Sequence, residues 1–151
     1  NKYSEELFME LLIKLKEKYG KLYLTTDLTS QESFQKIYKF YEIYNDENLH
    51  NLSKSNKDII LLDKLNFENW RSAIIKSKLV ITYECGCVHV ASMSNVPLLV
   101  IYDYKNKPNM INNEYAPFTK NYQKVISKQE MINREIMLKI KEMEINIFAK
   151  A

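Results

Sequence analysis

The fold is decided by residues 78–103, which read KLVITYECGCVHVASMSNVPLLVIYD. This stretch holds an apolar run, a short Glu84-Cys85-Gly86 turn, a segment with helical character and a second apolar run. Strands covered on both faces of a parallel sheet appear in a sequence as continuous rather than alternating apolar runs. The pattern predicts two buried parallel strands joined by a short helix, with the turn at the edge where open α/β sheets bind ligands.

Strand and helix patterns alternate along the whole chain. Helices are predicted over residues 5–19, 29–44, 66–77, 87–95 and 128–148. Strands are predicted over residues 21–26, 58–62, 79–83, 98–102 and 122–126. Residues 45–57 and 103–121 are predicted loops, and the helix after Asn66 is expected to turn Phe67, Trp70, Ala73 and Ile74 inward. This order predicts an α/β fold, a three-layer Rossmann-like sandwich with a mostly parallel sheet of about five strands.

Composition restricts the class of protein. The 151 residues predict one domain, and no run approaches the roughly 18 apolar residues that span a bilayer. The net charge of +3, spread over 22 basic and 19 acidic residues, does not indicate a nucleic-acid partner. Cys85 and Cys87 are too close in sequence for an ordinary disulfide, so a reducing cytoplasm is expected.

Gly86 is one of only two glycines in the chain, and it stands at the predicted strand-to-helix junction. A glycine there lets the backbone come close to a ligand, and the N–H groups of the helix start favour an anion such as a phosphate. The alternative interpretation is that Gly86 only makes the turn.

Three further side chains near sheet edges have two interpretations each. His89 either donates to a phosphate oxygen or is a buried histidine bonded to a backbone carbonyl. Glu84 either binds ligand hydroxyls or accepts the N–H groups of the helix start. Asp27 either accepts hydrogen bonds from a ribose diol or caps the turn before the next helix.

Cys85, Cys87 and His89 raise two other kinds of chemistry, both less favoured. A structural zinc ion takes four ligands, and the second histidine, His50, lies in a distant polar segment. A Cys–His nucleophile pair lacks a visible third group to orient it. We therefore expect neither a metal nor another cofactor.

Residues 81–103, with Gly86, His89 and Pro97, resemble the donor-site motif of glycosyltransferase family 9. This family contains the heptosyltransferases of lipopolysaccharide core synthesis, in which a strand leads to an Asp-Ser/Thr-Gly-x-x-His stretch and then to a strand that begins near a proline. Gly86 and His89 match outright, Glu84 stands where the family has Asp, and Cys85 stands where it has Ser or Thr.

The resemblance implies the carboxy-terminal, donor-binding half of a two-domain GT-B enzyme. Residues 1–127 would form the nucleotide-sugar-binding domain, and residues 128–151 a helix that packs on it or on a partner domain. The amides of Cys85, Gly86 and Cys87 would meet the diphosphate with His89 nearby, Glu84 would contact the donor, and Asp27 would hold the ribose. The donor would be ADP-heptose or a similar nucleotide sugar.

The resemblance also implies a division of labour. A glycolipid or glycan acceptor and the usual catalytic base would belong to an amino-terminal domain outside these residues, so none of the present residues is expected to be catalytic. The chain alone would bind donor weakly and transfer nothing. A cytoplasmic location is expected, with peripheral association at the inner membrane allowed. The alternative is a non-catalytic, degenerate Rossmann-like module whose turn binds nothing.

Overall fold

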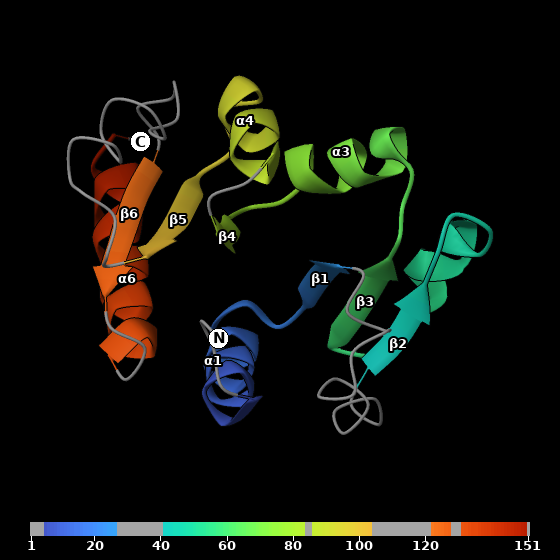
Figure 1. The fold of residues 1–151 in the computed structure, drawn as a ribbon, viewed down its shortest axis with the longest axis horizontal. Helices are drawn as coiled ribbons and strands as arrows, with labels where there is room; N and C mark the ends of the chain where they lie inside the picture. Colours follow the sequence, from blue (N-terminus) through green and yellow to red (C-terminus); the bar gives the residue numbers. More distant parts are fainter. Residues whose placement is uncertain (1–4, 27–40, 84–85, 104–121, 128–130, 151) are drawn as a thin grey trace. The chain divides into compact units, whose positions relative to one another are not determined.

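The computed structural model describes residues 5–26, 41–83, 86–103, 122–127 and 131–150. The chain divides into two compact units, which we call the first unit (essentially Tyr3–Trp70) and the second unit (essentially Arg71–Ala151). Figure 1 shows the elements of both, and each unit is described by itself.

The described elements are a mixture of helices and strands that fits an α/β fold. The α-helices are α1 (Glu5–Tyr19), α3 (Phe67–Ile75), α4 (Gly86–Met93) and α6 (Ile132–Lys150), and the 3₁₀ helix is η3 (Leu49–Lys54). The strands are β1 (Leu22–Thr26), β2 (Tyr41–Tyr44), β3 (Ile59–Asp63), β4 (Val80–Tyr83), β5 (Leu98–Asp103) and β6 (Tyr122–Ser127). None of the described helices is long and apolar enough to cross a membrane.

The first unit is a parallel sheet with strand order β1-β3-β2, so β3 lies between the other two strands (Figure 1). The side chains of β3 from Ile59 to Leu62 are all buried, which explains why this segment is continuously apolar. Helix α1 covers the sheet by packing Leu12 against Ile59 and Leu61. It is followed by Gly20, whose φ of +80° is the left-handed conformation typical of a helix stop.

The second unit is a parallel sheet with strand order β4-β5-β6, again with the most apolar strand in the middle. Residues 98–102 of β5 are at most 4% exposed, so both faces of this strand are covered. Helix α6 packs on β5 and β6 and buries the stripe Ile132, Ile136, Ile140 and Met143. The prediction of buried parallel strands is therefore confirmed, whereas the domain bounds 1–127 and 128–151 stay a prediction.

Residues 41–44 correct one prediction, because they form strand β2 and not the end of a helix. The segment Tyr-Glu-Ile-Tyr is aromatic and β-branched, and it pairs in parallel with β3, with Tyr41 opposite Ile59 and Tyr44 opposite Leu62. The predicted helix over residues 29–44 includes Tyr41–Tyr44 because apolar residues keep helical spacing up to this point in the sequence. Residues 29–40 themselves lie outside the described part. Part of the predicted loop 45–57 is also ordered, as η3.

Tyr102 and Tyr122 form a hydroxyl pair in the second unit. Burial raises the pKa of Tyr122 above its ordinary value of 10.0, and a side-chain hydrogen bond with Tyr102 partly opposes this rise in pKa. Tyr102 is itself almost fully buried. The folded chain thus holds the Tyr122 proton more tightly than the unfolded chain does.

Replacing Ile136 by Ala is expected to lower the free energy of unfolding by about 2–5 kcal/mol, because a cavity is left where α6 meets the sheet. Leu138, on the same helix, is 46% exposed, so Leu138→Ala is the matched control and should change the free energy by less than about 0.5 kcal/mol. Urea denaturation followed by circular dichroism measures both. Equal losses in the two variants would contradict the packing of α6 described above.

Replacing Tyr122 by Phe is expected to change how stability depends on alkaline pH. The stabilisation from the raised pKa is fully present below the unfolded pKa of about 10 and is lost as pH rises through the folded pKa. The free energy of unfolding should therefore fall more steeply above about pH 10 for the parent chain than for Tyr122→Phe. The exposed Tyr23→Phe is the control, and it should keep the parent slope.

Candidate functional site

Helix α4 begins at the carboxyl edge of the second unit's sheet. Strand β4 ends at Tyr83, opposite Ile101 of β5, and α4 starts at Gly86, three positions later. The Val80 N–H donates to the Pro97 carbonyl at 2.9 Å, and α4 contacts both β4 and β5. The first amides of α4 therefore lie where parallel strands end, as the sequence predicts for a ligand-binding turn.

The two sides of α4 differ in burial. Its buried residues face the protein interior and are Cys87, Val88, Ala91 and Ser92. Gly86 and His89 are exposed, and their three-residue spacing puts them on the same side of the helix. The open side of α4 thus carries bare backbone at its start and an imidazole one turn later.

The described part of the fold gives no reason for a glycine at position 86. Its φ lies outside the left-handed region, unlike that of Gly20, so another residue could adopt the same backbone conformation. Apart from its chain neighbours and the backbone of its own helix, a Cβ added at Gly86 would meet no heavy atom of the described residues within 4 Å, so none of these residues would clash with a side chain. Neither backbone conformation nor packing therefore requires glycine there, and what glycine provides is an uncovered backbone.

The exposure of His89 decides between its two interpretations, and it also bears on the Cys–His pair. Because His89 is exposed, the interpretation as a buried, carbonyl-bonded histidine is wrong. Cys87 is only 8% exposed and lies two positions away, and side chains two apart on a helix point in different directions. Helix α4 therefore does not form a Cys87–His89 pair. Across the described ranges, no group of three His, Cys, Asp or Glu side chains is placed to hold a metal ion.

The six predicted binding residues divide into two sets. Gly86, Cys87 and His89 are brought together on α4, with the Cys87 side chain turned inward. Glu84, Cys85 and Asp27 lie outside the described residues, so their roles stay predictions.

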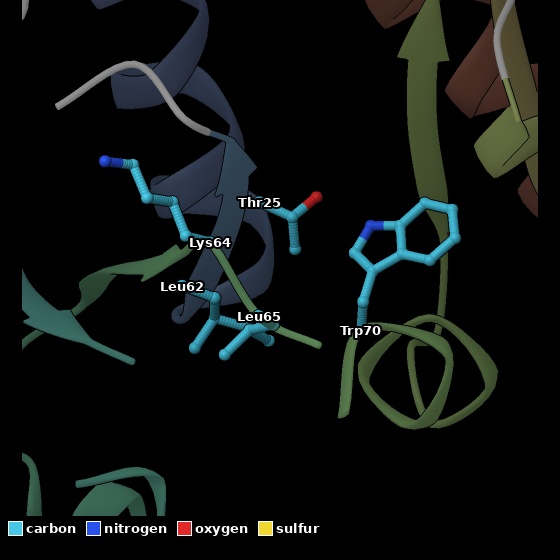
Figure 2. Close-up of a pocket in the computed structure, with 5 residues that line it drawn as sticks. All are labelled: Thr25, Leu62, Lys64, Leu65 and Trp70. Atoms are coloured by element: carbon cyan, nitrogen blue, oxygen red, sulfur yellow. The ribbon is translucent and has the colours of Figure 1, made fainter. Parts of the chain in front are cut away.

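A pocket that the sequence reasoning missed lies at the carboxyl edge of the first unit's sheet. Its volume is about 250 Å³, and it is lined by Thr25, Leu62, Lys64, Leu65 and Trp70. Thr25 of β1 and Leu62 of β3 are opposite each other in register, so they form one wall together. In Figure 2 the Trp70 indole stands across from Thr25, with its ring nitrogen on the side that faces the threonine hydroxyl.

The pocket offers an apolar floor and one aromatic wall. Leu62 is buried, Leu65 and Trp70 are half-buried, and Thr25 is exposed. Lys64 follows β3 with a φ of +51°, an uncommon conformation for a lysine, and its side chain extends away from Trp70 in Figure 2. A flat ring resting on the indole and near a hydroxyl is the chemistry that this arrangement suits.

Helix α3 carries the aromatic wall, and Asn66 caps this helix. The Asn66 side-chain oxygen accepts the Asn69 N–H at 2.8 Å. Phe67 is 62% exposed, so the prediction that it faces inward is wrong. It packs instead beside Trp70, with ring centroids 5.9 Å apart.

The pocket could not be predicted from the spacing of residues in the sequence, because its residues come from β1, β3, the link after β3 and α3. The usable signals were the chain's single tryptophan and the rule that ligands bind at carboxyl edges.

Comparisons with known proteins add no family to these observations. A scan against protein-family models found no match, and searches of curated proteins and of solved structures found none either. A proposal of function therefore rests on the start of α4, on the pocket and on the resemblance of residues 81–103.

Proposed function

We propose that this chain is the nucleotide-sugar-binding region of a glycosyltransferase that transfers heptose or a related sugar in lipopolysaccharide or other surface-glycan synthesis. The observation that carries the proposal is the start of α4, where an exposed glycine that the fold does not require opens a helix at the carboxyl edge of a parallel sheet.

The charge of a diphosphate suits this helix start. The first N–H groups of an α-helix have no partner within the helix, and the helix dipole adds about half a positive charge there. Phosphate oxygens can approach backbone amides closely only where no side chain intervenes. Gly86 leaves that approach clear, so the helix start would hold the diphosphate of the donor.

The same charge matters during transfer. When the sugar leaves the donor, negative charge develops on the departing nucleoside diphosphate, and fixed N–H donors stabilise it without rearranging. His89, exposed on the same side of α4, would add a donor one turn further along. The residues of this chain would thus assist the leaving group, and the acceptor hydroxyl would be deprotonated by another domain without a metal ion.

The pocket of the first unit suits a flat ring, because nucleobases and similar rings stack on aromatic side chains. Trp70 supplies such a face, Leu62 and Leu65 an apolar floor, and Thr25 a hydroxyl that can bond a ring edge. We propose that this pocket, taken by itself, binds a nucleobase such as adenine.

The finer fold belongs to the same proposal. All described strand pairs are parallel, and the middle strand of each three-stranded sheet is buried on both faces. These features favour a three-layer Rossmann-like sandwich with a mostly parallel sheet of about five strands. Within it Glu84 would contact the donor and Asp27 the ribose.

Nucleoside diphosphates and their sugars are expected to raise the melting temperature of the chain. A ligand at a hundred times its Kd stabilises a folded protein by about 2.7 kcal/mol. A thermal-shift panel of ADP, UDP, GDP and CDP, each with and without sugar, measures the effect. His89→Ala and Gly86→Ala should both reduce the shift, since they remove a donor and cover the helix start respectively.

The control is His50→Ala, because His50 is the chain's other histidine and is exposed in η3. It should leave the shift unchanged, and ligand-free Gly86→Ala should melt no lower than the parent chain. If no member of the panel stabilises the chain, or if all three variants respond like the parent, the alternative of a non-catalytic Rossmann-like module is favoured.

Adenosine, which has no phosphate, is expected to quench the fluorescence of Trp70 by stacking on it. Trp70 is the only tryptophan, so the signal comes from the pocket wall alone. Leu65→Asp should weaken adenosine binding by about tenfold or more, because it puts a carboxylate on the apolar floor. Ile13→Asp places the same charge on an exposed face of α1 and should bind adenosine normally. Equal affinities in these two variants would rule out the pocket as the base site.

A further inference from the structure

We propose that Asp46 is a positioning residue for the Trp70 wall of the pocket. The proposal rests on the base-binding role given to the pocket above. Asp46 follows strand β2 and lies twenty positions before Asn66, yet its carboxylate is bonded to the first turn of α3. The hydrogen bonds of Asp46 go to Asn66 and Asn69, which do not line the pocket, so Asp46 would affect a ligand through α3.

Three hydrogen bonds join Asp46 to α3. The Asn66 N–H donates to both carboxylate oxygens, at 3.0 Å to Oδ1 and 2.9 Å to Oδ2. The Asn69 side-chain amide donates to Oδ1 at 2.8 Å. Both oxygens therefore hold the same helix end.

These bonds reproduce a capping box whose acidic half comes from elsewhere in the chain. In an ordinary capping box, a Glu or Gln at the third helical position reaches back to accept the N–H of the capping residue. Here that position is Asn69, which donates to Asp46 instead, and Asp46 accepts the Asn66 N–H in its place. The negative carboxylate also suits the positive end of the helix dipole.

Asp46 is itself held in place by its neighbours. The Asn45 side-chain oxygen accepts the N–H groups of Glu47 and Asn48, at 3.0 and 3.2 Å, and the Asn48 side-chain oxygen accepts the Asn45 N–H at 2.7 Å. The turn that carries Asp46 is thus closed by its own side chains. Because this turn holds the Asp46 carboxylate in place, the carboxylate in turn holds Asn66 and Asn69 in place.

Trp70 is next to the residues that Asp46 binds. Its N–H donates to the Asn66 carbonyl at 2.9 Å, which is a bond of the helix's first turn. Trp70 follows Asn69 directly, so a shift of this turn moves the indole relative to Thr25 and Leu62 on the sheet. Asp46 would therefore set the width of the slot between Trp70 and the sheet.

The experiment compares Asp46→Ala and Asp46→Asn with Asp58→Ala, in which another exposed carboxylate of the first unit, 3.9 Å from the Lys16 ammonium, is removed. The single indole N–H signal of Trp70 is recorded by NMR, first without ligand and then during a titration with adenosine. Melting curves identify a temperature at which every variant is folded.

Asp46→Ala is expected to move the Trp70 indole signal before any ligand is added, and to weaken adenosine binding about fivefold through loss of the cap. Asp46→Asn keeps one acceptor oxygen and should lie between Asp46→Ala and the parent chain. Asp58→Ala should match the parent in both measurements.

An indole signal and an adenosine affinity in Asp46→Ala that match those of Asp58→Ala would overturn the proposal, even if Asp46→Ala melts lower, because Asp46 would then only stabilise. Absence of adenosine binding by the parent chain is a different outcome. It would remove the base-binding role of the pocket, while the ligand-free indole signal would still decide whether Asp46 positions Trp70.

Discussion

Burial of both faces of the central strands β3 and β5 is the constraint on which the rest of the structure depends. A strand with no solvent-facing side must be apolar at successive positions, and it needs a hydrogen-bonded strand on each edge and covering layers on each face. In the first unit β1 and β2 flank β3, and in the second β4 and β6 flank β5. Because all of these pairs are parallel, the strands of each sheet end together at one edge. In the second unit this edge precedes the start of α4, and in the first unit it borders the pocket.

Elements with a strong local pattern could be predicted from the sequence, and elements that depend on distant partners could not. Helix α1 and its stop at Gly20 follow from spacing and from one glycine, and the stripe of α6 follows from isoleucines one turn apart. Strand β2 was missed because four residues are too few to show a period, and only pairing with β3 makes them a strand. Phe67 has the right spacing for burial, yet it is the first residue of α3 and is 62% exposed.

The candidate sites divide in the same way. The start of α4 could be found because a short glycine turn between two apolar runs is a contiguous signal, and the structure then places Gly86 and His89 on one open side. The pocket and the Asp46 cap join residues up to about forty-five positions apart, from Thr25 to Trp70. Their geometry exists only once β1 and β3 are paired and α3 is fixed, so no local pattern in the sequence could reveal it.

The two glycines of this chain serve opposite purposes. Gly20 is tied to its position by backbone conformation, since a φ of +80° strains any residue with a side chain. Gly86 is not constrained in this way, because its φ is not left-handed and none of the described residues beyond its own helix lies within 4 Å of an added Cβ. In related chains that no longer bind a ligand, substitutions of Gly86 by larger residues would therefore be tolerated without loss of folding. The same substitution of Gly20 would destabilise all of these chains.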